Sequence, residues 1–383
     1  MEVDTLTHGA GAGWSHPLPR HLNSPRTLVV VFGAAEHAPH DAALAQLRTA
    51  LPDSVIAGCS TAGEIFGGAV RDDTLSVAVV RFRHIRLALA LTPLADAADS
   101  LAAGARLARA LDAPGLRAVL VFSDGLQVNG TALVDGLTRG LPSTVALSGG
   151  LAGDGGRFQS TWVLAGEQCQ SGQVCAVGLY GEALRVGLGT GGGWADFGPE
   201  RRITRASGQV LYELDGKPAL ELYRTYLGEF AAGLPATALR FPLSVRAPGA
   251  SDEPLVRTIL AVDEATSSLT FAGDIPEGGT ARLMRANHLR LIDSAAAAGE
   301  AAIAGAHLAP ASPALALSVS CVGRRMVLGE HTDEELESIS AALPPGSGHV
   351  GFYSYGEISP AGGCDSRLHN QTMTVTVLSE DGA

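Results

Sequence analysis

Apolar residues in this chain follow two alternating patterns, continuous runs and helical spacing. The run TLVVVFG (27–33) is rich in branched residues and ends in Gly, which is typical of a strand buried on both faces. HDAALAQLRTAL (40–51) has apolar residues at helical spacing, with Asp41 as the expected N-cap. SVIAGCSTAGEI (54–65) predicts a strand that runs into a Gly-rich turn with an acid, and TLSVAVVRF (74–82) predicts the closing strand.

This order of strand, helix, strand, Gly-acid turn and strand recurs twice. The second copy comprises LRAVLVFSDG (116–125), NGTALVDGLTRGL (129–141), TVALSGGLAGD (144–154) and STWVLAG (160–166). The third comprises a strand ALALSVSCVGRRMVLG (314–329), a helix TDEELESISAAL (332–343) with a capping box of Thr332 and Glu335, the strand and turn HVGFYSYGEI (349–358), and TMTVTVL (372–378). The chain therefore predicts a repeated β-α-β-turn-β unit.

A different pattern separates the second and third copies. It predicts strands over 189–216 and 258–286, a helix over 217–228 and an Ala-rich helix over 288–306. We expect residues 1–25 to form a flexible lead-in, and a break near residues 181–190 to divide the rest into 26–185 and 186–383. The predicted fold is α/β, with two α/β halves built from the repeated units and mixed sheets.

Composition narrows the class of protein. The formal net charge is −12 with no Lys/Arg-rich tract, which argues against nucleic acid and anionic membrane as partners. No apolar run approaches the ~20 residues that span a bilayer, and the N-terminus lacks the pattern of a secretory signal. Five Cys without a CxxC pair favour a reduced, cytoplasmic protein and argue against a structural zinc site or covalent c-type haem.

The acids beside the Gly-rich turns are the first candidates for chemistry. STAGEI and YSYGEI share Gly-Glu-Ile, and the three turns carry Glu64, Asp154 and Glu357 at the C-terminal ends of strands. Open α/β sheets bind ligands at that end of their strands. We expect Glu64 and Glu357 to face one shared cleft. The alternative is duplication of a stable unit in which Gly serves only the turn.

Polar residues at the predicted strand ends suit a small zwitterion, since acids would hold an ammonium group and backbone N–H groups a carboxylate. The alternative is that these residues only form turns and caps. The expected ligand-binding residues are Ser60, Thr61, Glu64, Ser123, Asp124, Asn129, Gly150, Asp154, Tyr353, Tyr355, Glu357 and Asn370.

Catalytic signatures are missing from the sequence. GCSTAG is not the GxSxG of a nucleophile elbow, Ser60 has no His at a diagnostic spacing, and no GK[ST] follows a Gly-rich turn. We therefore expect a binding protein rather than an enzyme. The alternative from that class is an enzyme that uses Glu64 or Glu357 as acid or base.

Several longer strings resemble the FIST family, which has a FIST N domain followed by a FIST C domain. AGCSTAGEIFGG, VFSDGLQVNG and SGGLAGDGG are similar to the N-domain pattern. GPERRITRASGQVLYELDGKPALELYRTYLGE, FAGDIPEGG, VSCVGRRMVLGE, GFYSYGEISP and LHNQTMTVTVL are similar to the C-domain pattern. The resemblance implies a bacterial cytoplasmic sensory module for signal transduction. Its ligand would be amino acid-like, and its separate partner a histidine kinase, a cyclic-dinucleotide enzyme or a chemotaxis receptor.

One branch of that family binds haem and responds to nitric oxide, so the resemblance also implies a haem-binding alternative. His369, next to Asn370 in LHNQT, is the candidate ligand of haem iron, and His288 is the second. His349, His331 and the loop thiol Cys364 are weaker candidates. The alternative for His369 is a hydrogen bond to backbone in a tight connection.

Overall fold

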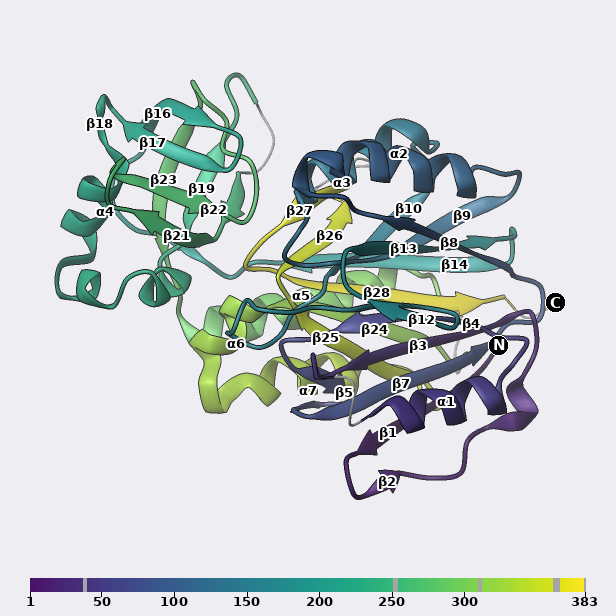
Figure 1. Ribbon diagram of the computed structural model, residues 1–383. Coiled ribbons are helices and arrows are strands. Elements are labelled where there is room, and N and C mark those ends of the chain that lie inside the picture. The colour runs from purple at the N-terminus through teal and green to yellow at the C-terminus, as the bar shows by residue number, and fades with distance from the viewer. Residues whose placement is uncertain (37–39, 251–253, 309–311, 361–365, 382–383) are drawn as a thin grey trace.

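The computed structural model describes residues 1–36, 40–250, 254–308, 312–360 and 366–381 (Figure 1). Its sheets contain both parallel and antiparallel pairs, which confirms the predicted α/β class with mixed sheets. Three units follow one another along the chain, and each forms the main part of one sheet. A fourth set of strands belongs to a domain inserted into the third unit.

The first unit pairs β3 with β4 in parallel and closes with β7 antiparallel to β3. Its elements are β1 (Glu2–Gly9), β2 (Gly13–Trp14), β3 (Thr27–Gly33), α1 (Asp41–Ala50), β4 (Val55–Ser60), β5 (Glu64–Phe66), β6 (Ala69–Arg71) and β7 (Thr74–Arg81). The second unit repeats this arrangement with β8 (Arg86–Pro93), α2 (Ser100–Leu111), β9 (Leu116–Ser123), α3 (Gly130–Gly140), β10 (Ala146–Leu151), β11 (Val163–Ala165), β12 (Gln168–Gln170) and β13 (Gln173–Tyr180).

The third unit has the same order with a parallel pair of β24 and β25 and a closing strand β28. Its elements are β14 (Leu184–Gly191), α5 (His288–Gly305), β24 (Leu315–Cys321), α6 (Val322–Leu328), α7 (Thr332–Ala342), β25 (Gly348–Ser354), β26 (Gly356–Pro360), β27 (Ser366–His369) and β28 (Met373–Glu380). Short 3-10 helices in the described chain are Arg20–Leu22, Ala97–Asp99, Gly228–Gly233, Ala236–Arg240 and Gly329–His331.

Each unit gives a pair of strands to the sheet of a neighbouring unit, namely β5 with β6, β26 with β27, and β11 with β12. After its turn, the first unit sends β5 to pair with β25 of the third; the third sends β26 to β10 of the second; and the second sends β11 to β4 of the first. The exchange forms a closed cycle. The two predicted halves are therefore interleaved, because strands from 26–185 and 186–383 complete each other's sheets.

The inserted domain, residues 195–285, stands beside the three-unit body in Figure 1. It has its own apolar core, which includes Ile203, Tyr223 and Phe271. Its elements are β15 (Ala195–Asp196), β16 (Arg201–Ser207), β17 (Val210–Leu214), β18 (Lys217–Pro218), α4 (Ala219–Leu227), β19 (Leu243–Arg246), β20 (Leu255–Arg257), β21 (Ile259–Asp263), β22 (Ser268–Phe271) and β23 (Thr280–Arg285).

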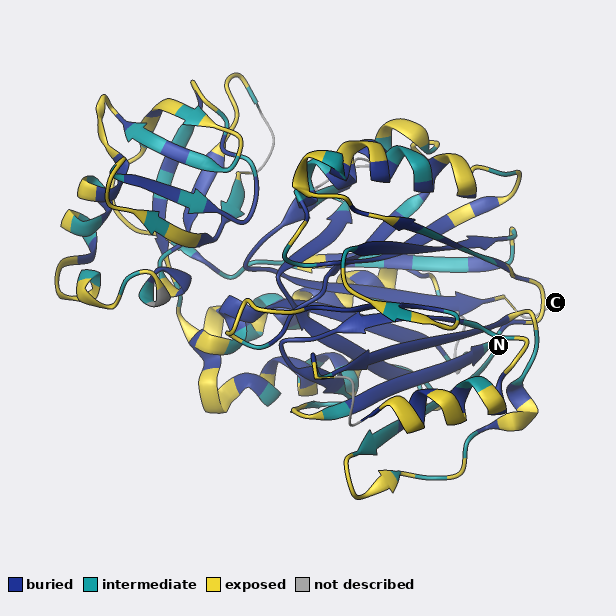
Figure 2. Cartoon of the chain, viewed as in Figure 1, coloured by how far each residue is buried: buried dark blue, intermediate teal, exposed yellow. Residues whose placement is uncertain are grey.

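The central strands of the three units are buried on both faces, and the helices cover the outside of the body (Figure 2). This close packing explains one class of glycine. Gly58, Gly149 and Gly351 occupy equivalent places on the second strand of each unit, and a Cβ at any of them would overlap a backbone carbonyl of the neighbouring parallel strand. Two strands approach too closely there for any side chain.

Three local predictions need correction. The start of the expected flexible lead-in is ordered, because β1 pairs with β7 along its whole length and Leu6 is buried. The strand expected over 314–329 ends at Cys321, and the apolar residues that follow form helix α6. The capping box is absent, since Thr332 donates to the carbonyl of Gly329 and the carboxylate of Glu335 points into the core.

Candidate functional site

The Gly-acid turns of the three units meet and are joined by backbone hydrogen bonds. The amide of Ala62 donates to the carbonyl of Tyr353 at 2.8 Å, which links the first turn to the third. The amide of Tyr355 donates to Leu151 at 3.1 Å, and the amide of Gly153 donates to Ser60 at 3.1 Å, which closes the ring through the second turn. The strand exchange brings the turns together, because each donated strand begins where its turn ends.

Glu64 and Glu357 have the same set of hydrogen-bond donors. Oε1 of Glu64 accepts from the Thr61 hydroxyl at 2.5 Å, and its Oε2 accepts from the amide and hydroxyl of Thr74 at 3.0 and 2.9 Å. For Glu357 the corresponding distances are 2.6 Å from the Ser354 hydroxyl and 3.1 and 2.9 Å from the amide and hydroxyl of Thr372. The repeated Gly-Glu string is therefore a duplicated structural device, in which the acid ties its turn to the start of the closing strand.

Burial shifts the proton affinity of both carboxyl groups in the same direction. Burial raises the pKa of Glu64 to about 7, although the hydrogen bonds from Thr61 and Thr74 act to lower it. Burial likewise raises the pKa of Glu357 to about 7 against the bonds from Ser354 and Thr372. Neither pKa shift by itself indicates catalysis, because both follow from the same structural role.

An acidic cavity, here called the junction hollow, opens beside the first and second turns and has a volume of about 260 Å³. Its polar and charged lining consists of Thr61, Glu64, Asp72, Asp73, Asp154 and Arg157. Glu357 is not part of this lining, which corrects the expectation that Glu64 and Glu357 face one cleft. Strand exchange carries Glu357 away between β10 and β27, where it is fully buried.

Asp154 belongs to the hollow but is not equivalent to the two glutamates. Val163 holds the register position in the second unit that Glu64 and Glu357 hold in theirs. Asp154 instead accepts hydrogen bonds from the amides of residues 158–160 at 2.7–2.9 Å and from the Tyr355 hydroxyl. Burial would raise its pKa, but these bonds outweigh burial and the pKa is lowered. Asp154 is therefore a buried negative charge at the edge of the hollow.

Three more charged residues of the hollow were not singled out by the sequence analysis, namely Asp72, Asp73 and Arg157. Asp73 is exposed, and among the described residues its carboxylate makes no hydrogen bond or ion pair. Asp72 pairs with Arg325 at 2.6 Å. Nε of Arg157 donates to the carbonyl of Asp154 at 2.9 Å, and its guanidinium pairs with Glu36 at 3.1 Å. The hollow thus offers several carboxylates and one guanidinium.

Five other expected ligand residues have structural roles instead. The Ser60 hydroxyl accepts from the amide of Trp162, and the carboxylate of buried Asp124 accepts amides and the Thr161 hydroxyl. Asn129 caps helix α3 by accepting from the amide of Ala132. A side chain at Gly150 would collide with its neighbours on other strands. Ser123 is buried as well, with its hydroxyl donating to a backbone carbonyl. These residues do not line the hollow.

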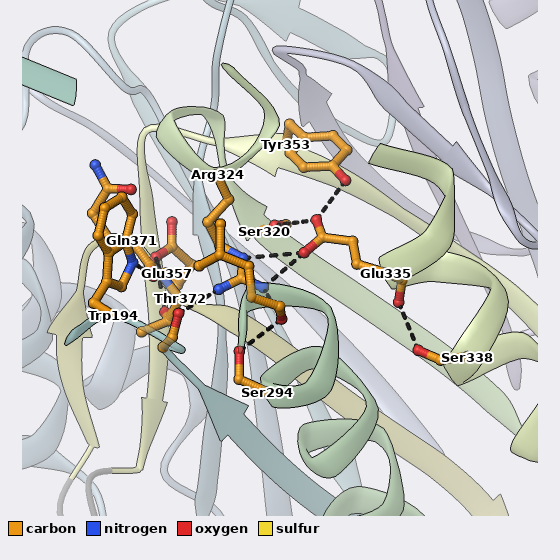
Figure 3. A network of polar contacts seen from close by, with 12 residues as sticks. Trp194, Ser294, Ser320, Arg324, Glu335, Ser338, Tyr353, Glu357, Gln371 and Thr372 are labelled. Atoms are coloured by element: carbon orange, nitrogen blue, oxygen red, sulfur yellow. Dashed lines mark hydrogen bonds and ion pairs between the residues drawn. The ribbon is translucent and has the colours of Figure 1, made fainter. Parts of the chain in front are cut away.

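Tyr353 leads from the turns to a buried ion pair (Figure 3). Its hydroxyl donates to Oε1 of Glu335 at 2.7 Å, and Glu335 pairs with Arg324 at 2.7 Å, both side chains being 0% exposed. Arg324 also donates to the carbonyls of Gly192 at 2.6 Å and Leu291 at 2.8 Å. Gly192 lies just before the inserted domain in the chain, and Leu291 lies just after it. The network connects the turns to the place where that domain joins the body.

His369 and Asn370 lie on and after β27. Nε2 of His369 is 3.1 Å from the carbonyl oxygen of Ser359, and burial, with Arg257 nearby, lowers its pKa to about 4. This contact occupies Nε2 and leaves Nδ1 of the buried ring as the nitrogen available to a metal ion. Asn370 is 1% exposed, and both of its side-chain polar atoms lack a partner in the described part of the chain.

The remaining candidates for a metal or haem lie elsewhere. His288 and His331 are exposed side by side, with ring centroids 5.5 Å apart. Both ring nitrogens of His349 contact serine hydroxyls, at 2.8 and 2.7 Å. Cys364 lies outside the described residues. Within the described ranges, no group of three or more His, Cys, Asp or Glu side chains is arranged to hold a metal ion.

Comparison with known families gives two adjacent matches that together cover most of the chain. The FIST N domain model matches residues 27–217, and the FIST C domain model matches residues 219–360. The chain belongs to the FIST family. FIST domains are sensory domains of signal transduction. The two FIST matches meet inside the inserted domain, between β18 and α4.

The comparison with curated proteins gives a partial match to an archaeal protein. The chain is 35% identical over 114 residues to the uncharacterized protein MJ1623 of Methanocaldococcus jannaschii. That similarity covers 29% of this FIST chain and 21% of the archaeal protein, so the chain spans about a fifth of the relative's length. Among the described helices of the FIST chain, none combines the length and apolar character needed to cross a bilayer.

Proposed function

We propose that this FIST protein is a cytoplasmic sensor that binds a small amine or amino acid in the junction hollow and signals through a separate protein. The supporting observation is the hollow itself, about 260 Å³ in volume and lined by carboxylates and one guanidinium. An ammonium group would contact Asp73, the carboxylate that has no partner among the described residues. A ligand carboxylate would contact Arg157.

The position of the hollow allows such a ligand to contact two units of the fold at once. Thr61 and Glu64 come from the first unit, and Asp154 and Arg157 come from the second. A ligand that binds one relative arrangement of the turns more tightly than another shifts the population toward it. The partner that reads this shift would be a histidine kinase, a cyclic-dinucleotide enzyme or a chemotaxis receptor, the classes that the family resemblance implies.

The test is calorimetric titration with a panel of amino acids and small amines, preceded by a thermal-shift screen. Asp73→Asn should weaken binding of the best ligand at least tenfold, since a charge-assisted hydrogen bond is worth ~1.5–3 kcal/mol. Asp135→Asn is the matched control, because Asp135 is an exposed acid on α3, remote from the hollow lining. Absence of any ligand in the panel, or equal affinity in Asp73→Asn and wild type, would refute the proposal.

The haem alternative has its own readout. Titration with haem should give no Soret band typical of an axially ligated protein, because His369 is buried and does not line the junction hollow. A Soret band that shifts in His369→Ala would favour the haem-binding nitric-oxide sensor instead.

We also propose that the chain is not a hydrolase. Glu64 has the raised pKa of a general base and lines the hollow, which is the observation that favours an enzyme. However, Glu357 has the same pKa and the same donors without lining the hollow, so the shift needs no catalytic explanation. Turnover of ester, phosphoester or amide substrates should stay at background. Activity that disappears in Glu64→Gln would contradict this proposal.

A further inference from the structure

A second cavity, here called the arginine cleft, lies between the inserted domain and the third unit and has a volume of about 190 Å³. The inserted domain contributes Arg246 at the end of β19, Arg257 at the end of β20, and Asp274. The third unit contributes Arg367 on β27. The function proposed above makes no use of this cleft.

Arg257 is the unusual member of the cleft lining. Its side chain is only 3% exposed, and no carboxylate in the described part of the chain lies within ion-pair distance of it, although the charge of Asp274 acts to raise its pKa. Its acceptors are backbone carbonyls: Leu368 at 3.0 Å, Asp274 at 3.3 Å and Val256 at 3.4 Å. A buried charge normally has a counter-ion or ligates one. Burial lowers the pKa of Arg257 to about 10, so it remains protonated at neutral pH.

The other lining residues add positive charge and an apolar wall. Arg246 is exposed, and its guanidinium makes no ion pair or hydrogen bond within the described ranges. The carboxylate of Asp274 accepts from the Asn129 side chain at 3.0 Å, which holds it toward the body. Val245, Leu255 and Ile275 supply apolar contact. Positive charge therefore exceeds negative charge in a chain whose overall charge is −12.

We propose that the arginine cleft binds a small anion, a carboxylate or phosphate compound, between Arg246 and Arg257. Guanidinium groups bind both kinds of oxyanion in a bidentate manner. Such a ligand contacts both the inserted domain and the body, because Arg367 of β27 lines the same cleft. Anion binding would then hold the domain in one position relative to the three units.

The test uses sodium phosphate and sodium succinate as probes, with sodium chloride at matched ionic strength as the reference. Calorimetry on the wild-type chain should detect saturable binding of at least one probe. Arg246→Gln should weaken that binding at least tenfold, and this exposed substitution leaves the core intact. Arg202→Gln is the matched control, since Arg202 is exposed on β16 of the same domain but outside the cleft lining.

Binding of phosphate alone or of succinate alone would support the proposal and identify the kind of anion. Equal effects of chloride, equal loss in Arg246→Gln and Arg202→Gln, or no saturable binding would overturn it. Asp73→Asn should leave anion binding unchanged, because that residue lies in the junction hollow. Failure of the amine sensor and failure of the anion site are thus observed separately.

Discussion

The duplicated carboxyl groups predict a pH-dependent effect of one substitution. In Glu64→Gln, the amide oxygen can accept from Thr74 and the amide NH₂ can donate to the Thr61 hydroxyl, as the protonated acid does. The variant therefore resembles the wild type below the pKa of Glu64 and differs from it above. We expect it to become more stable than the wild type as pH rises.

The magnitude follows from the difference in proton affinity between the two states. The pKa of Glu64 is about 7 in the folded chain against an ordinary value of 4.5, so the folded state binds the proton more tightly. Stability is unaffected below pH 4.5, falls as pH rises from 4.5 to 7, and is constant above 7. Since one pKa unit corresponds to ~1.4 kcal/mol, ionisation of Glu64 costs about 3 kcal/mol in total and about 2.5 kcal/mol between pH 5 and pH 8.

Urea denaturation followed by tryptophan fluorescence measures this effect. The comparison must be between variant and wild type, because the lowered pKa values of His349 and His369, both about 4, change wild-type stability in the opposite direction over acid pH. Those contributions cancel when the two chains are compared at each pH. Glu182→Gln is the control, since Glu182 is 85% exposed and its substitution should have a pH-independent effect.

One result would refute the reasoning. If the free-energy difference between Glu64→Gln and wild type is the same at pH 5 and pH 8, burial does not govern this carboxyl group. Glu357→Gln should show the same pH dependence, because its donors correspond one to one. A different profile for Glu357 would show that the two turns are not energetically equivalent.

Two further substitutions test other parts of the fold. Glu335→Gln should lower the free energy of unfolding by ~3–5 kcal/mol in urea denaturation, because Arg324 would remain buried without its counter-ion. The double change Arg324→Met with Glu335→Leu should recover most of that loss. A cost of under ~1 kcal/mol for Glu335→Gln would contradict this prediction. Gly351→Ala should lower the free energy of unfolding by at least ~2 kcal/mol in thermal unfolding, because its methyl group would overlap the Ser318 carbonyl. Gly305→Ala should be nearly neutral, because a methyl group there makes only ordinary contacts. Similar melting temperatures for the two variants would contradict the packing argument.

The repeated unit was predictable from sequence because its signals are local. Branched apolar runs, helical spacing and Gly-acid turns each occupy about ten residues, and the strings STAGEI and YSYGEI mark two equivalent acids. Their joint placement was not predictable. It depends on which strand receives each donated strand, and pairs such as β5 with β25 connect residues almost three hundred positions apart.

Two misreadings have specific physical causes. Apolar residues resume after Gly323 and two arginines in α6, so the pattern predicts one continuous strand and misses the end of β24 at Cys321. Glu335 fitted a capping box by spacing, but Arg324 lies one helix earlier and holds its carboxylate in the core. The Arg324–Glu335 ion pair could not be predicted, because rules based on residue spacing do not describe contacts between different helices.

The cyclic exchange of strands has a consequence for how the chain is made. β10 is complete as soon as the second unit is synthesised, but its partner β26 follows only about 200 residues later. At ~5–20 residues per second, the ribosome leaves that strand edge unpaired for roughly 10–40 s. An open edge can accept a strand from any chain within reach, including a second copy of this protein. The nascent FIST chain therefore passes through a period in which intermolecular strand exchange competes with closure of its own ring.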